Sequence, residues 1–311
     1  RLLTYSEPQG EYDLRCALAD YVRERRNVVT APEHIVVGAG VQMLLEILCV
    51  LLKGRRTVSF PDGSFVQGST VFAAHGYTVR TRYKDADIIY VSPSHMNRQG
   101  DVMPIQRRLE LCAHSADTGA VVIEDDFEND FLYSSTPTPS LYALGSGNVV
   151  YMGAFSALLL PGIRISFMVL SPALAAAYHQ MKDTFAQTAS KTEQIALCAY
   201  LRDGNMKSRT KKIRRLYTGK AKTLCTLLAK ALPDHPVRVG ENGLQVQIET
   251  PMLPDSAPFE QAGLALYIVK EKSGKNIVVV SPSAVPADRL EEAAHAVAAA
   301  LYKAEEAAKA K

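Results

Sequence analysis

The stretch HIVVGAGVQMLLEILCVLL, residues 34–52, reads as a strand, a turn and a helix in succession. Its start is a short β-branched run, two glycines follow, and apolar residues then recur at helical spacing. A glycine turn here leaves the first amide groups of the helix without backbone partners, and such amides can bind an anion such as phosphate. The motif is neither a GxGxxG nor a P-loop, so an ordinary tight turn is at least as good an interpretation.

The same alternation of strand and helix continues on both sides of this stretch. RRTVSFPD, YTVRTRY, DADIIYVSPS, AVVIEDDF and NVVYMGAF predict strands, whereas YDLRCALADYVRERR, GSTVFAAHG and MPIQRRLELCAHSADTG predict helices. Such alternation predicts an α/β fold with a mostly parallel central sheet and helices on both faces. Ligands of such sheets collect at the carboxyl ends of the strands.

The C-terminal part shows a different pattern of predicted helices and strands. A long helical region from Ser190 to Leu232 precedes two strands, LQVQIET and NIVVVSPS, and an Ala- and Glu-rich terminal helix whose last dozen residues we expect to fray. We therefore predict a large domain over residues 1–215 and a smaller α/β domain over residues 216–311. Two strand pairs follow each other abruptly, near Tyr83–Lys84 and Val269–Asn276. Because a parallel crossover needs about a dozen residues, this abruptness predicts that segments are absent there.

Composition excludes several classes of protein. The 311 residues are 47% apolar and 22% charged, and 35 basic residues nearly balance 32 acidic ones, so composition favours neither a nucleic-acid surface nor an acidic substrate. The five cysteines lie far apart without a CxxC pair, which argues against a zinc site and a disulfide framework. No apolar run approaches the ~18 residues of a membrane span. We expect a cytoplasmic protein with no metal site.

Three polar segments are candidates for chemistry. Glu124, Asp125 and Asp126 end a buried strand, where a carboxylate can bind a metal, act as a base or pair with a protonated ring nitrogen; a solvated acidic turn is the alternative. His95 follows another strand, although a lone histidine is more often structural. The basic residues between Lys207 and Arg215 could contact nucleic acid, but a solvated helix face is the better interpretation.

The order of these motifs carries more information than any one of them. YSEPQGEYDLRCALADYV, VGAGVQMLLEIL, SPSHMNRQGDVMPIQRRLELC, IEDDFENDF and MGAFSALLLPGIRIS together resemble the aminotransferase-like domain of MocR-type regulators, a branch of the GntR transcription factors. The resemblance runs from about Tyr5 to Tyr217 and more loosely to the terminal helix. It implies fold type I of the pyridoxal-phosphate proteins, and SPSH and EDDFENDF are closer to the regulators than to the enzymes.

The resemblance also implies a ligand and its contacts. The ligand is pyridoxal 5'-phosphate, held non-covalently in this chain or as an external aldimine with an amine. Asp125 matches the aspartate that pairs with the pyridine nitrogen, and Ser156 and Arg164 match phosphate ligands. Tyr5 matches a tyrosine that reaches the phosphate of the partner subunit, which implies a homodimer. The other implied cofactor-binding residues are Gly40, Val41 and Gln42 at the phosphate turn, Phe65, His95 and Phe127.

Departures from the family pattern bear on function. Phe65 and Phe127 stand where tyrosines are usual, and Ala157 occupies the position of the lysine that forms the Schiff base. The arginine that clamps a substrate carboxylate would fall near Val279. The resemblance therefore implies a domain without catalytic residues.

Two functions follow from the resemblance. The first is the effector-sensing and dimerisation domain of a MocR-type regulator, which binds a small amino compound as an imine and acts on DNA through an N-terminal winged-helix domain absent from this chain. The second is a pyridoxal-phosphate-dependent aminotransferase inactivated by a lysine-to-alanine change. Ala157 fits a natural lysine-less protein and an engineered one equally well.

Overall fold

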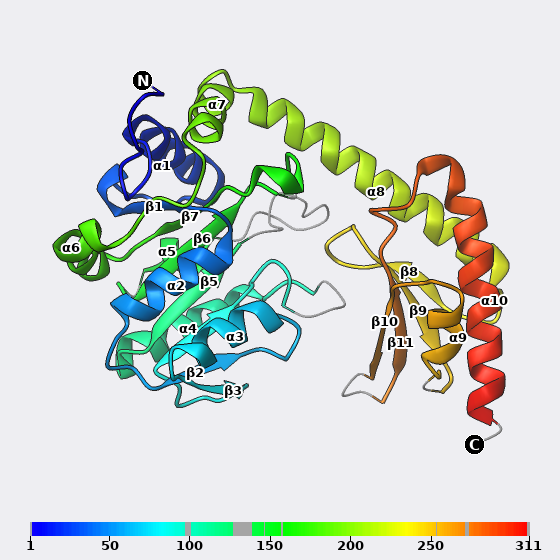
Figure 1. Ribbon diagram of the computed structural model, residues 1–311. Helices are drawn as coiled ribbons and strands as arrows, with labels where there is room; N and C mark the ends of the chain where they lie inside the picture. The colour runs from blue at the N-terminus through cyan, green and yellow to red at the C-terminus, as the bar shows by residue number, and fades with distance from the viewer. Residues whose placement is uncertain are drawn as a thin grey trace. The chain divides into compact units, whose positions relative to one another are not determined.

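The chain forms two compact units in the computed structural model, which describes residues 2–96, 101–126, 139–145, 147–156, 158–252, 254–270 and 274–309 (Figure 1). The described residues of the first unit lie within Arg1–Met96, Met103–Asp130 and Thr136–Thr210; those of the second lie within Asn97–Val102, Phe131–Ser135 and Lys211–Lys311. This division, and the sequence-based boundary at residue 215, both fall inside one long helix, α8 (Asn205–Ala231).

A seven-stranded sheet forms the centre of the first unit, in the order β1-β7-β6-β5-β4-β2-β3. Its strands, in chain order, are β1 (Ile35–Gly38), β2 (Thr57–Phe60), β3 (Thr78–Thr81), β4 (Ile88–Val91), β5 (Val121–Asp125), β6 (Val149–Ala154) and β7 (Ser166–Val169). The pairs from β3 to β6 are parallel, and β7 runs antiparallel to both of its neighbours. The predicted mostly parallel sheet is confirmed. The sequence pattern does not predict β7, because its residues form an apolar run without alternation.

Helices cover this sheet on two sides (Figure 1). The helices of the unit are α1 (Tyr12–Arg26), α2 (Val41–Leu51), α3 (Val66–Ala74), α4 (Ile105–Thr118), α5 (Leu141–Leu144), α6 (Pro172–Met181) and α7 (Lys191–Arg202), with short 3-10 turns at Pro32–His34, Pro161–Ile163 and Lys182–Thr184. Buried residues of α2, α3 and α6 share one apolar cluster with the sheet, whereas Cys112 of α4 and Leu141 of α5 pack on its other face. The first face is the one that carries the candidate site.

The abrupt link between β3 and β4 is closed by residues 82–87, although β2 lies between the two strands. Six extended residues can reach about 20 Å, which suffices to return along a four-residue strand and cross one neighbour. Asp87 fastens the link, because its carboxylate accepts the backbone N–H groups of Arg56 and Thr57 at 2.8 and 2.9 Å.

The second unit is built on an antiparallel sheet in the order β10-β11-β9-β8. Its elements are β8 (Val237–Val239), β9 (Val246–Thr250), α9 (Ala257–Gln261), β10 (Tyr267–Lys270), β11 (Asn276–Val280), a 3-10 turn at Ala287–Arg289 and α10 (Leu290–Lys309). β10 and β11 are antiparallel neighbours, so the sequence-based argument for a missing segment, which assumed a parallel crossover, does not apply to this pair.

The terminal helix corrects one prediction. We expected the last dozen residues to fray, but α10 continues to Lys309 and Leu301 and Ala304 are fully buried. Apolar residues at helical spacing hold this end, because they pack with Leu224 and Leu228 of α8 and with the strands in one core cluster.

Candidate functional site

The turn between β1 and α2 forms one end of the candidate site. Gly40 precedes α2 with φ of 94°, a backbone conformation that L side chains rarely adopt, and no side chain caps the helix. Arg164 has φ of 47°, and a Cβ added to Gly40 would lie 2.5 Å from its guanidinium. The free amides of the first helical turn and an exposed guanidinium thus lie together, which is a donor set suited to a phosphate. We call this the phosphate end.

A distant segment fixes the phosphate end. Thr188 Oγ1 accepts the N–H of Ala39 at 2.9 Å, and the Gln187 amide donates to the carbonyl of Val37 at 3.1 Å. Both residues belong to the connection before α7. The position of the turn is therefore set before any ligand arrives.

The three consecutive carboxylates are buried, so the solvated-turn interpretation is wrong. Glu124 accepts the backbone N–H groups of Leu141 and Tyr142 at 2.9 and 3.0 Å and so caps α5. Burial, and next the charge of Asp126, raise the pKa of Glu124 to about 7, although the nearby Arg26 opposes the rise. Glu124 is a structural residue.

Asp126 belongs to a buried ion-pair network. Its carboxylate accepts Arg26 Nε at 2.5 Å, the Tyr151 hydroxyl at 2.8 Å and the Ser94 hydroxyl at 2.8 Å. Arg26 ends α1 and also lies 4.0 Å from Glu124. Burial works to lower the pKa of Arg26, but Asp126, Tyr151 and Glu124 raise it above its ordinary value. This network anchors the end of β5 to α1.

Asp125 points to the other face of the sheet, where aromatic rings gather. The Tyr90 hydroxyl donates a hydrogen bond to Asp125 Oδ2. The Tyr90 ring lies 5.3 Å from the ring of Phe65 and 5.0 Å from that of Phe60, centroid to centroid. Phe65 is in turn pressed against Gly68, where an added Cβ would collide with the ring. Phe65, Tyr90 and Asp125 form what we call the ring end of the site.

The remaining predicted residues lie as follows. Val41 is half-buried, Gln42 is exposed, and Ser156 is half-buried in the turn after β6. His95 is half-buried after β4, and its backbone N–H donates to the backbone carbonyl of Ser92. Tyr5 is fully exposed. Phe127 and Ala157 lie outside the described residues.

Sequence reasoning missed two residues of the site. The sequence gives only a weak indication of Tyr90: it is an aromatic residue with a hydroxyl inside the otherwise aliphatic strand ADIIYV, and a buried hydroxyl needs a hydrogen-bond partner. Arg26 has none, because an arginine at the end of a helix is ordinarily read as a favourable charge at the helix C-terminus.

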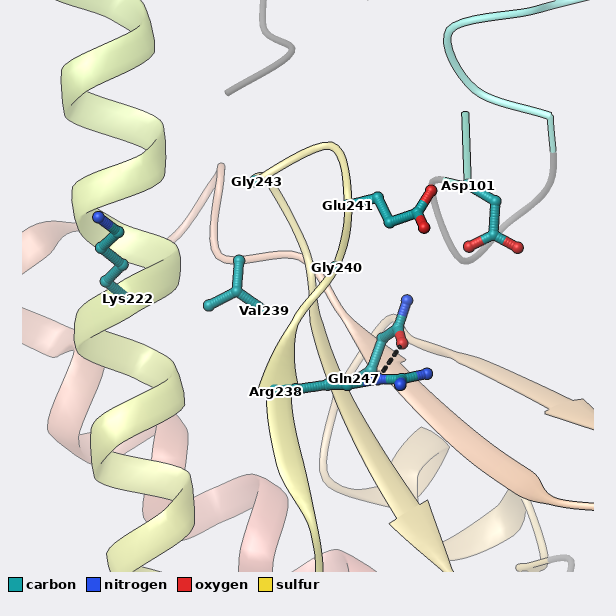
Figure 2. Close-up of a pocket in the computed structure, with 8 residues that line it drawn as sticks. All are labelled: Asp101, Lys222, Arg238, Val239, Gly240, Glu241, Gly243 and Gln247. Atoms are coloured by element: carbon teal, nitrogen blue, oxygen red, sulfur yellow. Dashed lines mark hydrogen bonds between the residues drawn. The ribbon is translucent and has the colours of Figure 1, made fainter. Parts of the chain in front are cut away.

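The second unit contains a separate pocket of about 450 Å³ (Figure 2). Arg238 donates to the Gln247 side chain at 2.9 Å, and Glu241 accepts the N–H of Val102 at 3.2 Å; in the view Glu241 points toward Asp101. The other residues that line it are Lys222, Val239, Gly240 and Gly243. None of the predicted cofactor-binding residues lines this pocket.

The described ranges contain neither a metal-binding cluster nor a membrane-spanning helix. They hold no group of three or more His, Cys, Asp or Glu residues arranged to bind a metal ion. None of their helices has the length and apolarity that a bilayer crossing demands.

Comparison with known proteins identifies the family. Residues 1–286 match the model of the family described as aminotransferase class I and II. The HTH-type transcriptional regulator YdeL of Bacillus subtilis (strain 168) is 30% identical over 88% of this chain and 60% of that protein. The probable rhizopine catabolism regulatory protein MocR of Rhizobium meliloti is 28% identical over 79% of this chain and 53% of that protein. The chain thus spans little more than half the length of these relatives.

Enzymes are relatives as well. The 2-aminoadipate transaminase of Thermus thermophilus is 26% identical over 75% of this chain and 62% of that protein. Among solved structures, an archaeal alanine:glyoxylate aminotransferase superposes with a TM-score of 0.82 at 20% identity, covering 96% of this chain and 82% of that one. The predicted aminotransferase fold is confirmed. The chain belongs to the aminotransferase class I and II family, and MocR and other HTH-type transcriptional regulators are among its relatives.

Proposed function

We propose that this chain is the effector-sensing and dimerisation domain of a MocR-type transcriptional regulator, and that it binds pyridoxal phosphate together with an amino compound. The observation that carries the proposal is the phosphate end, where Gly40 and Arg164 bring a helix N-terminus and a guanidinium together. The regulators among its relatives support sensing as the role of this site. Homodimerisation, a cytoplasmic location and DNA binding through an N-terminal winged-helix domain belong to the same proposal.

The residues present fit the proposed cofactor. The phosphate end offers N–H donors and a cation to a dianion, and the ring end offers an aromatic face on Phe65 and a buried carboxylate on Asp125. A pyridine ring carries the complementary features, a π-face and a basic nitrogen. When bound, pyridoxal phosphate supplies an aldehyde that condenses reversibly with primary amines.

The roles of the chain's residues follow from their chemistry. Arg164, the first-turn amides of α2 and the Ser156 hydroxyl would hold the phosphate, with Tyr5 of the partner subunit completing it. Phe65 would orient the ring by stacking, and Asp125 would hold a proton at the ring nitrogen. His95 and Phe127 are the further residues that we propose at the ring.

Ala157 favours sensing over catalysis. A methyl group can neither bond the aldehyde nor move a proton, so the site would keep an amine without converting it. In the sequence, the position of the carboxylate clamp corresponds to the neighbourhood of the apolar Val279, which agrees because this residue offers no charge to a substrate carboxylate. A ligand that stays bound can shift a conformational equilibrium, which is what a sensor requires.

Calorimetric titration tests the proposal. Pyridoxal phosphate is added to the chain and to the Ala157→Lys variant, each sample is reduced with borohydride, and the intact mass is measured. We expect both proteins to bind, and only the Ala157→Lys variant to gain the mass of the reduced cofactor. Binding by neither protein would remove the cofactor from the proposal.

A second candidate is an aminotransferase inactivated at position 157, favoured by the transaminase among the relatives. The Ala157→Lys variant separates the two candidates, because it restores the amine. Rapid amino-group transfer from amino acids to 2-oxo acids by this variant would support the enzyme. Binding of amines without transfer supports the sensor.

A further inference from the structure

Tyr90 lies at the centre of the ring end. It is fully surrounded by protein, with the rings of Phe60 and Phe65 on its sides and its hydroxyl on Asp125 Oδ2. Sheet register places it there, since β4 pairs with β5 so that Tyr90 is opposite Ile123, two residues before Asp125 on the same face. A tyrosine buried this deeply needs a partner for its hydroxyl, and the carboxylate provides it.

The direction of this hydrogen bond is fixed by chemistry. Burial, and next the charge of Asp125, raise the pKa of Tyr90 well above its ordinary value, so the phenol keeps its proton and donates. The neighbouring charges have other partners: Glu124 accepts the α5 amides, and Asp126 accepts Arg26. Met152, beside Asp125 on β6, and the two phenylalanine rings carry no charge.

We infer that Tyr90 is a positioning residue that weakens the hydrogen bond between Asp125 and a ring nitrogen, because the Tyr90 hydroxyl and that nitrogen share the Asp125 carboxylate. The inference rests on the proposed function. A hydrogen bond to a carboxylate disperses its charge and lowers its basicity. A ring nitrogen facing such a carboxylate loses its proton at lower pH than it would without the phenol.

This effect suits a sensor. A protonated ring nitrogen draws electrons from a bound amine and favours its conversion, whereas a neutral one draws fewer. Tyr90 thus acts in the same sense as Ala157, since both leave a captured amine intact.

The test follows the ring nitrogen directly. Pyridoxal phosphate labelled with ¹⁵N in the ring is bound to the chain and to the Tyr90→Phe variant, and the nitrogen chemical shift is recorded as a function of pH. Removal of the phenol should make Asp125 the stronger base. We expect the midpoint of the nitrogen titration to rise by about one pH unit, the scale of one hydrogen bond to a charged acceptor. An unchanged or lowered midpoint overturns the inference.

Two matched variants control for packing. Tyr77→Phe removes a hydroxyl from the same apolar cluster, where it donates to the Cys49 carbonyl at 2.9 Å. Tyr151→Phe removes a hydroxyl that donates to Asp126, the residue that follows Asp125 in the chain. Both should leave the titration of the ring nitrogen where it is. A shift as large as that of Tyr90→Phe in either control would show a general packing effect and overturn the inference.

A nearly isosteric replacement covers the case in which Tyr90→Phe does not fold. 3-Fluorotyrosine in place of Tyr90 is a more acidic phenol and a stronger donor, so the midpoint should fall. A rise, or no change, contradicts the inference. Failure of the unaltered chain to bind the labelled cofactor is a separate outcome, which overturns the proposed function and the inference with it.

Discussion

The phosphate end and the ring end of the candidate site are built in opposite ways. The phosphate end is a turn in which backbone amides, next to a glycine at positive φ, and one exposed arginine offer donors to a ligand. The ring end is a set of side chains in which Tyr90 and Asp125 are buried and the Tyr90 hydroxyl is bonded to Asp125 Oδ2. Removing a single donor from the first should therefore alter binding with little effect on stability, whereas changes at the second, and at the network beside it, should alter stability first.

The largest expected effect is on the ion pair that anchors the ring end. Arg26→Met removes the cation from two buried carboxylates, Asp126 and Glu124, and a buried pair broken on one side costs about 3–5 kcal/mol. Urea unfolding should show a lower midpoint with an unchanged slope. Arg23→Met on the same helix is the control, because its pair with Asp20 is exposed and should be worth less than about 1 kcal/mol. Equal losses in the two variants would contradict the contrast.

The next effect belongs to the phosphate end. Gly40→Ala adds a Cβ that collides with the Arg164 guanidinium and strains a backbone at positive φ, so we expect phosphate-containing ligands to bind about 100-fold more weakly, or about 3 kcal/mol. Calorimetry with pyridoxal phosphate and with inorganic phosphate measures it. Gly162→Ala, in the turn just before Arg164, meets only an ordinary contact at 3.7 Å and should bind normally. Retained affinity in Gly40→Ala would remove the turn from the site.

Glu124, on the face of β5 opposite Asp125, makes the stability of the chain depend on pH in a definite direction. Its folded-state pKa of about 7 is above its ordinary value, so the folded chain binds the proton more tightly than the unfolded chain. Stability from this group is present at low pH and is lost as the pH rises from about 5 to about 8, by about 2 kcal/mol. Glu124→Gln should lose less over that interval, as unfolding curves at the two pH values will reveal. A steeper loss in the variant would reverse the sign and refute the assignment.

The two ends also differ in how far the sequence predicts them. Backbone chemistry is visible in sequence, because GAGVQ between a strand and a helix indicates a free helix N-terminus, and the motif order indicates the fold. Long-range side-chain pairing is not, since Arg26 and Asp126 lie 100 residues apart. The β7 strand escaped prediction for a related reason: its identity depends on pairing with β1 and β6, which no local pattern records. The different roles of Glu124, Asp125 and Asp126 likewise depend on the face of the sheet toward which each side chain points and on the partners that it finds there.

The smallest effect tests whether the phosphate end is built from backbone. Val41 is the first residue of α2, a position where proline is tolerated because its missing N–H has no partner within the helix. Val41→Pro should therefore fold and yet bind phosphate about tenfold more weakly, the loss of about 1.4 kcal/mol expected for one donor. Val41→Thr keeps the N–H and nearly the same shape, so its affinity should stay within about twofold of the original. If the two variants bind alike, the amide of Val41 does not contact the ligand, and the guanidinium of Arg164 must hold the phosphate with other donors.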